Sequence, residues 1–462
     1  TVVDATGKWV TPGIIDVHSH LGVYPAPGAT AHNDGNEMTG PVTAHVWAEH
    51  GVWPQDPGFG AALAGGVTTM MILPGSANLI GGRGVVLKNV PATTMQEMKF
   101  PGAPHSVKMA CGENPKRYYG GRGQSPMTRM GNMAGYRAAF IEAQKYREAW
   151  DKYEAANADD GKRRKKSDGN GQPPARDLRM DTLAGVLRGD ITVQIHCYRA
   201  DEMALMIDLA REFDFKIAAF HHGVEAYKLA DTLAEEGICG ALWADWWGFK
   251  MEAYDGIQEN IALVDRPKNS CAIVHSDSSE GIQRLNQEAA KVMVRGERAG
   301  LKLPPEHAIR WLTTNAARAI GVADQTGLLA EGKMADVVVW NGNPFSSYAL
   351  AEQVFVENLA WAAAQAPDQR LVIEPLNPDD MPGYFLNDFD QAARILDDLG
   401  LAQVGLQFDL WHAARIEGHA QTVWNRHKAQ VSHIQIAGFP SRNEPGGGGF
   451  DLTGLCTEVD VM

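Results

Sequence analysis

Two histidines, His18 and His20, lie at the end of a short apolar stretch in the segment TPGIIDVHSHLG of residues 11–22. In an extended chain, side chains two positions apart point to the same side, so both imidazoles can reach one point in space. Two converging neutral imidazoles suit a divalent transition metal of the zinc type. Such a pair also occurs as a hydrogen-bonded surface pair, so residues elsewhere in the chain must decide between these interpretations.

Other residues able to bind a metal belong to separate apolar stretches. Lys108 lies within one stretch, His196 ends another, and His222 and Asp277 follow two more. Imidazole and carboxylate groups are ordinary zinc ligands, whereas a lysine can bind a metal only when its amine is not protonated. These residues form one site only if the fold brings their stretches together.

The elements that would position them are eight short apolar stretches with the character of strands. Helical segments, such as residues 57–64, 200–213 and 225–236, separate several of them. This alternation predicts an α/β fold with a parallel sheet. Eight such units match a (β/α)8 TIM barrel, in which the carboxyl ends of all strands lie on one face. The candidate ligands would meet at that face. The predicted strands span residues 13–17, 67–73, 84–90, 106–111, 191–196, 216–221, 238–243 and 271–275.

Residues 1 to about 356 resemble the amidohydrolase superfamily, in the branch of imidazolonepropionase-like and prolidase-like enzymes. The matching motifs are TPGIIDVHSH, VKMACGEN, QIHCYRADE, FHHGVEAY, IVHSDS, TTNAARAIG and TGLLAEGKMADVVVWNGNP. The resemblance implies one or two divalent ions, with Zn²⁺ expected and Mn²⁺ or Fe²⁺ as alternatives. A carboxylated Lys108 would bridge two metals, with Glu113 as the alternative ligand. The implied ligands are His18, His20, Lys108, His196, His222 and Asp277.

The implied reaction is hydrolysis of a C–N bond in an amide, a cyclic amide or a dipeptide. A bound divalent metal acidifies water and polarises a carbonyl group. Asp277 would act as general acid and base, taking a proton from water and passing it to the leaving amine. We expect Asp277 and His222 to be the catalytic residues.

Several neighbouring side chains are candidates for binding the substrate. Tyr198 and Arg199 follow His196 and could hold a substrate carboxylate, because arginine binds carboxylates through a bidentate fork. The alternative is that they are a surface pair on the next helix. His275 shares the face of Asp277, with a role in the core as the alternative. We expect His221 either to pack in the interior or to contact a metal ligand without binding the metal itself. Three tryptophans could wall the pocket or pack in the core: Trp243, Trp246 and Trp247.

From residue 357 the sequence resembles hydroxypyruvate isomerase and related sugar-isomerase barrels. Glu374, Asp409 and Gln435 each end an apolar stretch, as in successive βα units, and their oxygen atoms suit Mg²⁺ or Mn²⁺. The resemblance places His412 and Arg442 near the substrate. It covers about three strands, and Glu458 is not assigned the role of the second catalytic glutamate. We therefore expect a partial second barrel without isomerase activity, from a fusion of gene fragments or an artefact of sequence assembly. The alternatives are a sugar or keto-acid isomerase that works through this segment, and an inactive truncated fusion.

The predicted division of the chain has three parts. Residues 13–321 form the barrel, residues 1–12 with 322–356 form a remnant of a small β-sandwich, and residues 357–462 form the isomerase-like segment. The chain starts too late to supply the other sandwich strands that the superfamily places before the barrel. We expect a truncated sandwich with exposed strand edges. Residues 131–187 form a helical insertion.

The composition of the chain limits the kinds of partner and the cellular location that we expect. The net charge of −14 argues against nucleic acid or an anionic membrane as partner, and the basic run at residues 162–166 is typical of a solvated loop. We expect a small-molecule substrate and leave a homo-oligomer open. We expect a cytoplasmic protein. A periplasmic location is the alternative, because the chain starts inside a domain. Five scattered cysteines predict single buried thiols: Cys111, Cys197, Cys239, Cys271 and Cys456.

Overall fold

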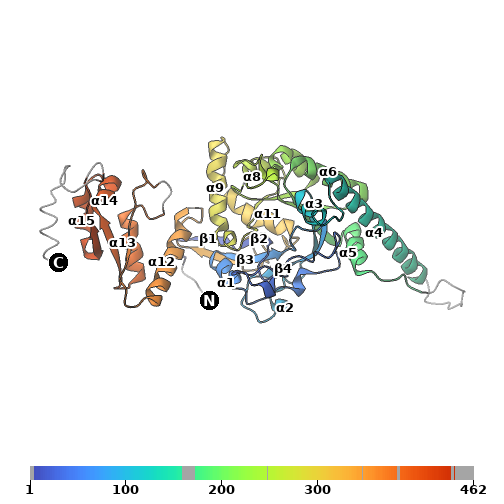
Figure 1. Cartoon of the computed structure of the whole chain (residues 1–462), viewed down its shortest axis with the longest axis horizontal. Coiled ribbons are helices and arrows are strands. Elements are labelled where there is room, and N and C mark those ends of the chain that lie inside the picture. The colour runs from blue at the N-terminus through green and yellow to red at the C-terminus, as the bar shows by residue number, and fades with distance from the viewer. Residues whose placement is uncertain are drawn as a thin grey trace. The chain divides into compact units, whose positions relative to one another are not determined.

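A computed structural model describes residues 5–158, 172–246, 248–345, 347–381, 385–438 and 442. The chain divides into two compact units, Thr1–Ser346 and Ser347–Met462 (Figure 1). Helix α12 (Ser347–Gln365) opens the second unit and spans the position where the sequence placed the boundary. Each unit is described by itself below.

The first unit contains the predicted barrel. Its eight-stranded sheet has the order β2 to β9, each strand pairing with the next along the chain. The backbone N–H of Asp277 donates to the carbonyl of His18 at 3.0 Å, which links the segment after the last strand to the first. The strands are β2 (Ile14–Ser19), β3 (Val67–Ile72), β4 (Ile80–Lys88), β5 (His105–Ala110), β6 (Ile191–Cys197), β7 (Ile217–His222), β8 (Cys239–Leu242) and β9 (Ala272–Val274).

One strand departs from the predicted all-parallel sheet. Strand β4 pairs antiparallel with both β3 and β5, whereas the other neighbouring pairs are parallel. The connection from β3 to β4 consists of residues 73–79 alone. A parallel crossover needs a dozen or more residues, so this short connection forces the chain to turn back. The parallel prediction is wrong for this strand.

Helices surround the barrel and fill the connections. The predicted helices at residues 57–64 and 200–213 are α1 (Pro57–Ala64) and α6 (Ala200–Phe213). The segment at 225–236 forms η3 (Ala226–Leu229) and α7 (Ala230–Glu236). Further helices of this unit are α3 (Glu113–Gly120), α8 (Asn260–Val264), α9 (Leu285–Arg298) and α11 (Thr314–Ala319).

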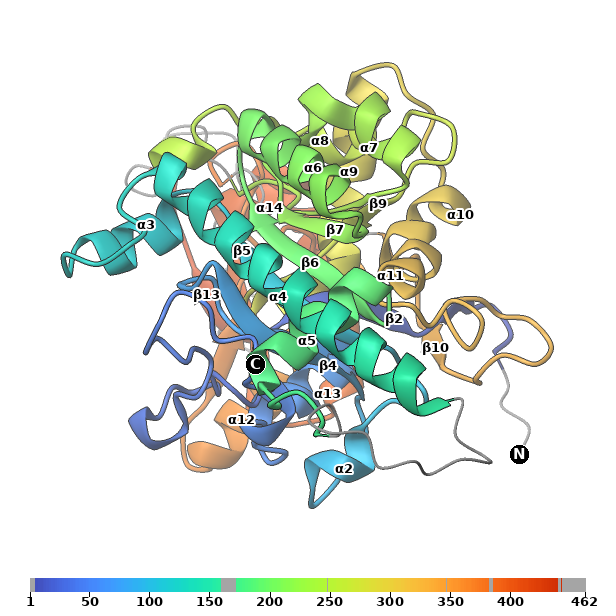
Figure 2. The same ribbon diagram turned by 90° about the vertical axis from the view of Figure 1, so that its right-hand side faces the viewer.

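The predicted helical insertion is present. Helix α4 (Arg129–Ala158) runs along the outside of the barrel with α5 (Leu178–Arg188) beside it, as Figure 2 shows. Arg129 at the start of α4 forms an ion pair with Glu202 at 3.0 Å and another with Glu252, both on buried carboxylates. The insertion is therefore anchored to α6 and to the segment after β8. The basic run at residues 162–166 lies outside the described residues.

The interior of the barrel is closed by packed apolar side chains. Ile15 and Val17 of β2 meet Met71 of β3 and Ile273 of β9 in one buried cluster. Every residue of β2 is buried, as expected for a strand covered on both faces. Burial of this kind holds the strand ends in place, and these ends carry the polar residues of the site.

The predicted sandwich segments form a two-stranded antiparallel sheet. Strand β1 (Trp9–Pro12) pairs with β10 (Val337–Trp340), with Trp9 opposite Trp340. The indole N–H of Trp340 donates to Thr11 Oγ1 at 2.9 Å. Trp9, Val10, Val337 and Val339 remain substantially exposed on this sheet.

Four of the five cysteines are not free thiols. Cys111 bonds to Cys197 and Cys239 bonds to Cys271, with Cα atoms 5.2 Å and 4.5 Å apart. The prediction of single thiols is wrong here because pairing of neighbouring strands brings together cysteines that lie 86 and 32 positions apart in the sequence. Cys456 lies outside the described residues.

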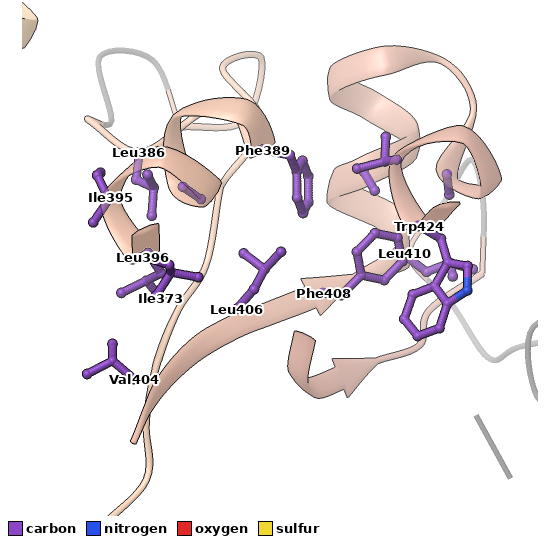
Figure 3. Close-up of a cluster of buried hydrophobic side chains, with 14 of the residues drawn as sticks. Ile373, Leu386, Phe389, Ile395, Leu396, Val404, Leu406, Phe408, Leu410 and Trp424 are labelled. Carbon is purple, nitrogen blue, oxygen red and sulfur yellow. The ribbon is translucent and has the colours of Figure 1, made fainter. Parts of the chain in front are cut away.

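The second unit is a small βα assembly. Its parallel sheet has the order β11 (Leu371–Ile373), β12 (Val404–Asp409) and β13 (Val431–Gln435). Helices α13 (Phe389–Leu399), α14 (Leu410–Glu417) and α15 (Ala420–His427) complete it. Figure 3 shows their apolar side chains, with Phe389, Leu406, Phe408 and Trp424 buried together. This core is distinct from that of the barrel.

Among the described residues of both units, no helix combines the length and apolar character needed to cross a lipid bilayer.

Candidate metal centre

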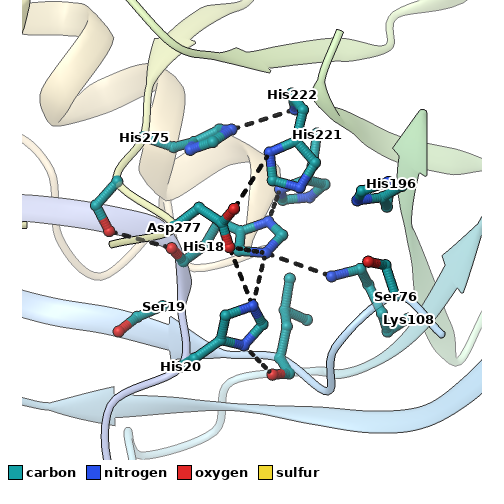
Figure 4. A network of polar contacts seen from close by, with 12 residues as sticks. His18, Ser19, His20, Ser76, Lys108, His196, His221, His222, His275 and Asp277 are labelled. Carbon is teal, nitrogen blue, oxygen red and sulfur yellow. Dashed lines mark hydrogen bonds and ion pairs between the residues drawn. The ribbon is translucent and has the colours of Figure 1, made fainter. Parts of the chain in front are cut away.

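Three of the predicted ligands face one another at the carboxyl end of β2. The Nε2 atoms of His18 and His20 are 3.4 Å apart, and Asp277 Oδ1 lies 3.3 Å from the first and 3.1 Å from the second (Figure 4). Tetrahedral zinc with bonds of about 2.0–2.2 Å separates its ligand atoms by roughly 3.3–3.5 Å. The three atoms are therefore spaced as the edges of one tetrahedral shell, and the donor set fits a zinc-type ion.

Hydrogen bonds behind His18 fix which nitrogen faces this centre. His18 Nδ1 lies 2.9 Å from His221 Nδ1, and His221 Nε2 lies 2.8 Å from Gln194 Oε1. The amide of Gln194 in turn donates to the carbonyl of Ala319 at 2.9 Å. An amide oxygen only accepts, so His221 donates through Nε2 and accepts from His18 through Nδ1. His18 thus keeps its Nε2 lone pair toward the centre.

His20 is oriented in the same way by the backbone. Its Nδ1 donates to the carbonyl of Leu73 at 2.8 Å, which leaves the Nε2 lone pair on the side of Asp277. A histidine whose second nitrogen donates to a carbonyl is the usual arrangement of a metal-binding imidazole.

Lys108 reaches the centre from β5. Its Nζ lies 3.4 Å from His18 Nε2 and donates to the carbonyl of Pro74 at 3.1 Å. The side chain is 1% exposed, and this burial lowers the pKa of Lys108 from 10.5 to about 7. The alternative ligand Glu113 instead forms an ion pair with Lys250 at 3.2 Å. Of the two, Lys108 is the one that the fold brings to the histidines.

His196, His222 and His275 complete the ring of imidazoles. The ring of His222 lies 4.6 Å from that of His18 and 4.6 Å from that of His196. The backbone N–H of His222 donates to His275 Nε2 at 3.2 Å. The buried Nδ1 atoms of all three histidines have no hydrogen-bond partner among the described residues. Buried polar atoms are normally satisfied, so these three atoms lack the partner that a bound substrate or metal would supply. His275 Nε2 accepts from the backbone N–H of His222 and His196 Nε2 accepts from Asn114, so both neutral rings carry their hydrogen on Nδ1 and can donate it to a substrate. His222 Nδ1 can offer a lone pair to a metal.

Burial sets the charge state of the cluster. It lowers the pKa of His18, His196, His221 and His222 well below 6.5, so these imidazoles are neutral at neutral pH. Burial also lowers the pKa of His275, to about 3. Neutral imidazole is the form that binds metals.

Asp277 behaves in the opposite way from a simple buried acid. Burial raises its pKa, but the interactions with the neighbouring histidines His222, His20 and His275 outweigh burial and bring the pKa below its ordinary range. Asp277 is therefore ionised and able to accept a proton or bind a cation.

The backbone is unusual at two of the expected ligands. His222 has φ = 73° and Asp277 has φ = 58°, in the left-handed region that favours glycine. A residue other than glycine is strained in this region, and residues strained in this way cluster at functional sites. The conformation of both residues supports a functional reason for their placement.

The predicted substrate-binding residues divide into two groups. The ring of Tyr198 lies 4.8 Å from that of His196, and the ring of Trp243 stacks on His222 at 4.3 Å. Arg199, in contrast, donates twice to Asp201, at 2.9 and 2.8 Å. Its fork is occupied by that surface carboxylate. Trp246 is 41% exposed, and Trp247 lies outside the described residues.

A cavity of about 330 Å³ opens beside the expected ligands. His20 and Asp277 lie on one side of it, and Tyr24 and Glu280 line it as well. Hydroxyl groups of Ser19, Ser278 and Ser279 add polar surface. A cavity of this size that reaches the centre suits a small molecule.

Four polar residues near the centre were missed from the sequence: Asp16, Asn114, Gln194 and Lys250. Asp16 and Gln194 lie two positions before His18 and His196, so the period of a strand was a usable signal. Asp16 is fully buried, accepts from Ser276 and the backbone of His18, and burial raises its pKa to about 7. Asn114 and Lys250 lie outside the strands, where no period points to them.

The second unit gathers part of its predicted set. Ligand atoms of Glu374, Asp409 and His412 lie within 4.8 Å of one another. Asp409 already caps α14 and binds Arg442 at 2.9 Å. Gln435 accepts from Gln407 at 3.0 Å. Glu458 lies outside the described residues.

The two units are similar to different known proteins. The chain is similar to an amidohydrolase of known structure from Thermotoga maritima MSB8, with 37% identity, a TM-score of 0.63 and coverage of 75% of this chain and 85% of that one. It is 32% identical over 375 residues to amidohydrolase tasK of Hapsidospora irregularis, covering 78% of this chain. That match spans 37% of the length of tasK.

The second unit has different relatives. Residues 304–460 match the family model of the xylose isomerase-like TIM barrel. Hydroxypyruvate isomerase of Escherichia coli is 39% identical over 95 residues, which are 20% of this chain and 37% of that protein. The chain thus spans well under half the length of these curated relatives. These similarities show that the chain belongs to the amidohydrolase superfamily and carries a hydroxypyruvate isomerase-like segment after its barrel.

Proposed function

We propose that the first unit is a metal-dependent hydrolase that cleaves a C–N bond of an amide, a cyclic amide or a dipeptide. The observation that carries this proposal is the spacing of His18, His20 and Asp277, whose ligand atoms lie 3.1–3.4 Å apart. Membership of the amidohydrolase superfamily supports the same reaction class. His196, His222 and Lys108 would complete the ligand set.

A bound divalent ion of the zinc type would acidify water and polarise the carbonyl of the scissile bond. Asp277 lies at the centre as a carboxylate and would accept the proton of the attacking water through an oxygen not used as a ligand. The same carboxyl group would return this proton to the leaving nitrogen, so that no proton is gained or lost by the protein. His275, beside His222, is positioned to hydrogen-bond the substrate through its unpartnered Nδ1.

Lys108 would take part as a carbamate. Because burial brings its pKa to about 7, an appreciable fraction of the amine is neutral at neutral pH. The neutral amine can add through its lone pair to carbon dioxide and release one proton, which converts a neutral amine into an anionic carbamate. That group would bridge two metals, whereas an unmodified Lys108 would leave a site for one.

The test combines metal content with turnover. The full chain is purified, and zinc, manganese and iron are measured by elemental analysis before and after dialysis against a chelator. We expect one or two equivalents of metal, lost together with hydrolysis of N-acyl amino acids, dipeptides or cyclic amides, and lost in His18→Ala. A folded protein without bound metal, or hydrolysis that persists in His18→Ala, would refute the proposal.

A second candidate function belongs to the second unit. The grouping of Glu374, Asp409 and His412 favours binding of a divalent cation there. Arg442 occupies one oxygen of Asp409, and the sheet described in this unit has three strands, so we propose that it does not isomerise hydroxypyruvate. Isomerase activity that survives His18→Ala and His196→Ala but is lost in Glu374→Gln would overturn this expectation.

A further inference from the structure

A lysine that no predicted role includes lies one side chain away from the histidines of the metal centre. Lys250 belongs to the segment between β8 and η4 (Met251–Ala253), and its side chain is 17% exposed. Its Nζ lies 3.9 Å from the ring centre of Tyr198. It also donates to Asn114 Oδ1 at 3.2 Å and pairs with Glu113 Oε1 at 3.2 Å.

Two of these contacts, those with Asn114 and Tyr198, lead directly to expected ligands. The amide of Asn114 donates to His196 Nε2 at 3.2 Å. The ring of Tyr198 lies 4.8 Å from that of His196 and 5.6 Å from that of His222. The ammonium group of Lys250 is therefore one side chain away from two histidines of the centre.

Further aromatic side chains lie beside Lys250, whose Nζ is 5.7 Å from the ring centre of Phe249. Trp243 donates its N–H to the carbonyl of Ser276 at 3.1 Å, so the indole offers only its apolar faces to its other neighbours. The ring of Trp243 lies 4.9 Å from that of Trp246 and 5.8 Å from that of Phe249. Phe249 is 55% exposed and Trp246 is 41% exposed. Exposed aromatic rings beside a reaction centre suit the apolar part of a ligand.

The pairing with Glu113 shows which kind of group binds to Lys250. Its carboxylate is 22% exposed and forms the only ion pair of Lys250 found among the described residues. A charged hydrogen bond between an ammonium group and a carboxylate is stronger than a neutral one, particularly away from bulk water. The carboxylate of a substrate could replace the carboxylate of Glu113 beside Lys250. Arg199, the other cation expected to bind a substrate carboxylate, already pairs with Asp201.

We propose that Lys250 binds the carboxylate of the substrate, so that the substrate is an N-acyl amino acid or a dipeptide with an apolar group beside the scissile amide. The inference rests on the proposed hydrolase function and narrows its substrate class. In this arrangement Glu113 holds the place of the substrate carboxylate while the site is empty. A purely structural ion pair between Lys250 and Glu113 is the competing explanation.

The two explanations differ in the sign of one effect. If Lys250 binds the substrate, Lys250→Gln weakens binding of carboxylates, whereas Glu113→Gln removes a competitor and strengthens it. If the pair only ties its segment to α3, both substitutions act in the same direction. Lys250→Arg keeps the charge and should retain the preference for carboxylates.

Binding is measured by calorimetry on the full chain, both zinc-loaded and chelator-treated. The probes are hippurate with hippuramide and N-acetylproline with N-acetylprolinamide, which differ within each pair only in the terminal charge. We expect the acids to bind at least about tenfold more tightly than the amides, as expected for one hydrogen bond between charged groups. Lys250→Gln should abolish this difference, and Glu113→Gln should tighten binding of the acids several-fold.

Lys228→Gln serves as the matched control, because Lys228 also forms ion pairs but lies on η3 and pairs with Glu225 and Asp255. Equal binding of acids and amides by the unaltered protein, a preference retained in Lys250→Gln, weaker binding in Glu113→Gln, or loss of the preference in Arg199→Gln would each overturn the inference. Elemental analysis and turnover report separately on the hydrolase function. A chain without metal can still show the carboxylate preference, since Lys250 does not depend on the ion.

Discussion

His18 and His221 face each other through their Nδ1 atoms at 2.9 Å. His221 in turn donates to Gln194, so the contact leaves His18 with a hydrogen on Nδ1 and a lone pair on Nε2. The second histidine of the motif FHHG therefore faces the centre directly, whereas the first acts through His18. Two neighbouring residues of β7 can both reach His18, with ring centres 4.8 and 4.6 Å from its own, because φ = 73° at His222 interrupts the alternation of side chains along the strand.

The first prediction concerns this hydrogen bond. His221→Leu removes the acceptor and leaves His18 free to change its tautomer and rotate. Loss of such an outer partner typically costs about 10–100-fold in metal affinity, and we expect a zinc dissociation constant raised by that factor. Competition with a chromophoric chelator measures it. Zinc affinity unchanged in a folded His221→Leu protein would show that the contact has no orienting role.

The second prediction concerns thermal stability. An ion that binds only the folded chain stabilises it by about 2.7 kcal/mol when its free concentration is 100 times the dissociation constant. Removing metal with a chelator should lower the unfolding temperature of the wild type, and zinc should restore it. His20→Ala and Asp277→Asn should unfold at a temperature that no longer responds to zinc. A response retained in both variants would locate the ion elsewhere.

The third prediction uses the buried lysine. Burial lowers the pKa of Lys108 from 10.5 to about 7 in the folded chain, whereas the unfolded chain keeps the higher value. Between these two values the unfolded chain binds the additional proton, so the contribution of Lys108 to the free energy of unfolding rises with pH across that window. The difference between metal-free wild type and Lys108→Met, measured by denaturation at several pH values, isolates this contribution. A difference independent of pH would contradict the low pKa.

The same lysine gives a prediction about carbon dioxide. Protonation of Lys108 below pH 7 removes the lone pair that a carbamate needs. We therefore expect a second equivalent of metal only above about pH 7 and only when bicarbonate is present. Metal content measured after loading in degassed and in bicarbonate-supplemented buffer tests this expectation, with Lys108→Met as the control that binds the same amount in both.

Much of this site could be predicted because its residues follow the period of the strands. His18, His196 and Lys108 lie on apolar strands whose carboxyl ends meet at one face, and the structure brings them together there. The direction of β4 depends on the length of one connection, which the apolar pattern does not report. Lys250 lies in a connection without a period, and only the fold shows that it reaches Tyr198.

The last prediction separates the two disulfides by their position in the barrel. Cys111 and Cys197 lie at the carboxyl ends of β5 and β6, next to His196, and the N–H of Cys111 donates to the carbonyl of His196 at 2.9 Å. Cys239 and Cys271 lie at the amino ends of β8 and β9, at the opposite face. Removing either bond should lower the free energy of unfolding by about 2–4 kcal/mol, because each constrains the unfolded chain.

Only the first disulfide should also affect the metal centre, since only it holds the backbone of an expected ligand. We expect the double variant Cys111→Ser with Cys197→Ser to bind zinc more weakly, and Cys239→Ser with Cys271→Ser to bind it as the wild type does. Thiol titration before and after reduction verifies that the bonds are present in the protein used. Equal zinc affinity in both double variants would show that β6 holds His196 in place without this covalent link.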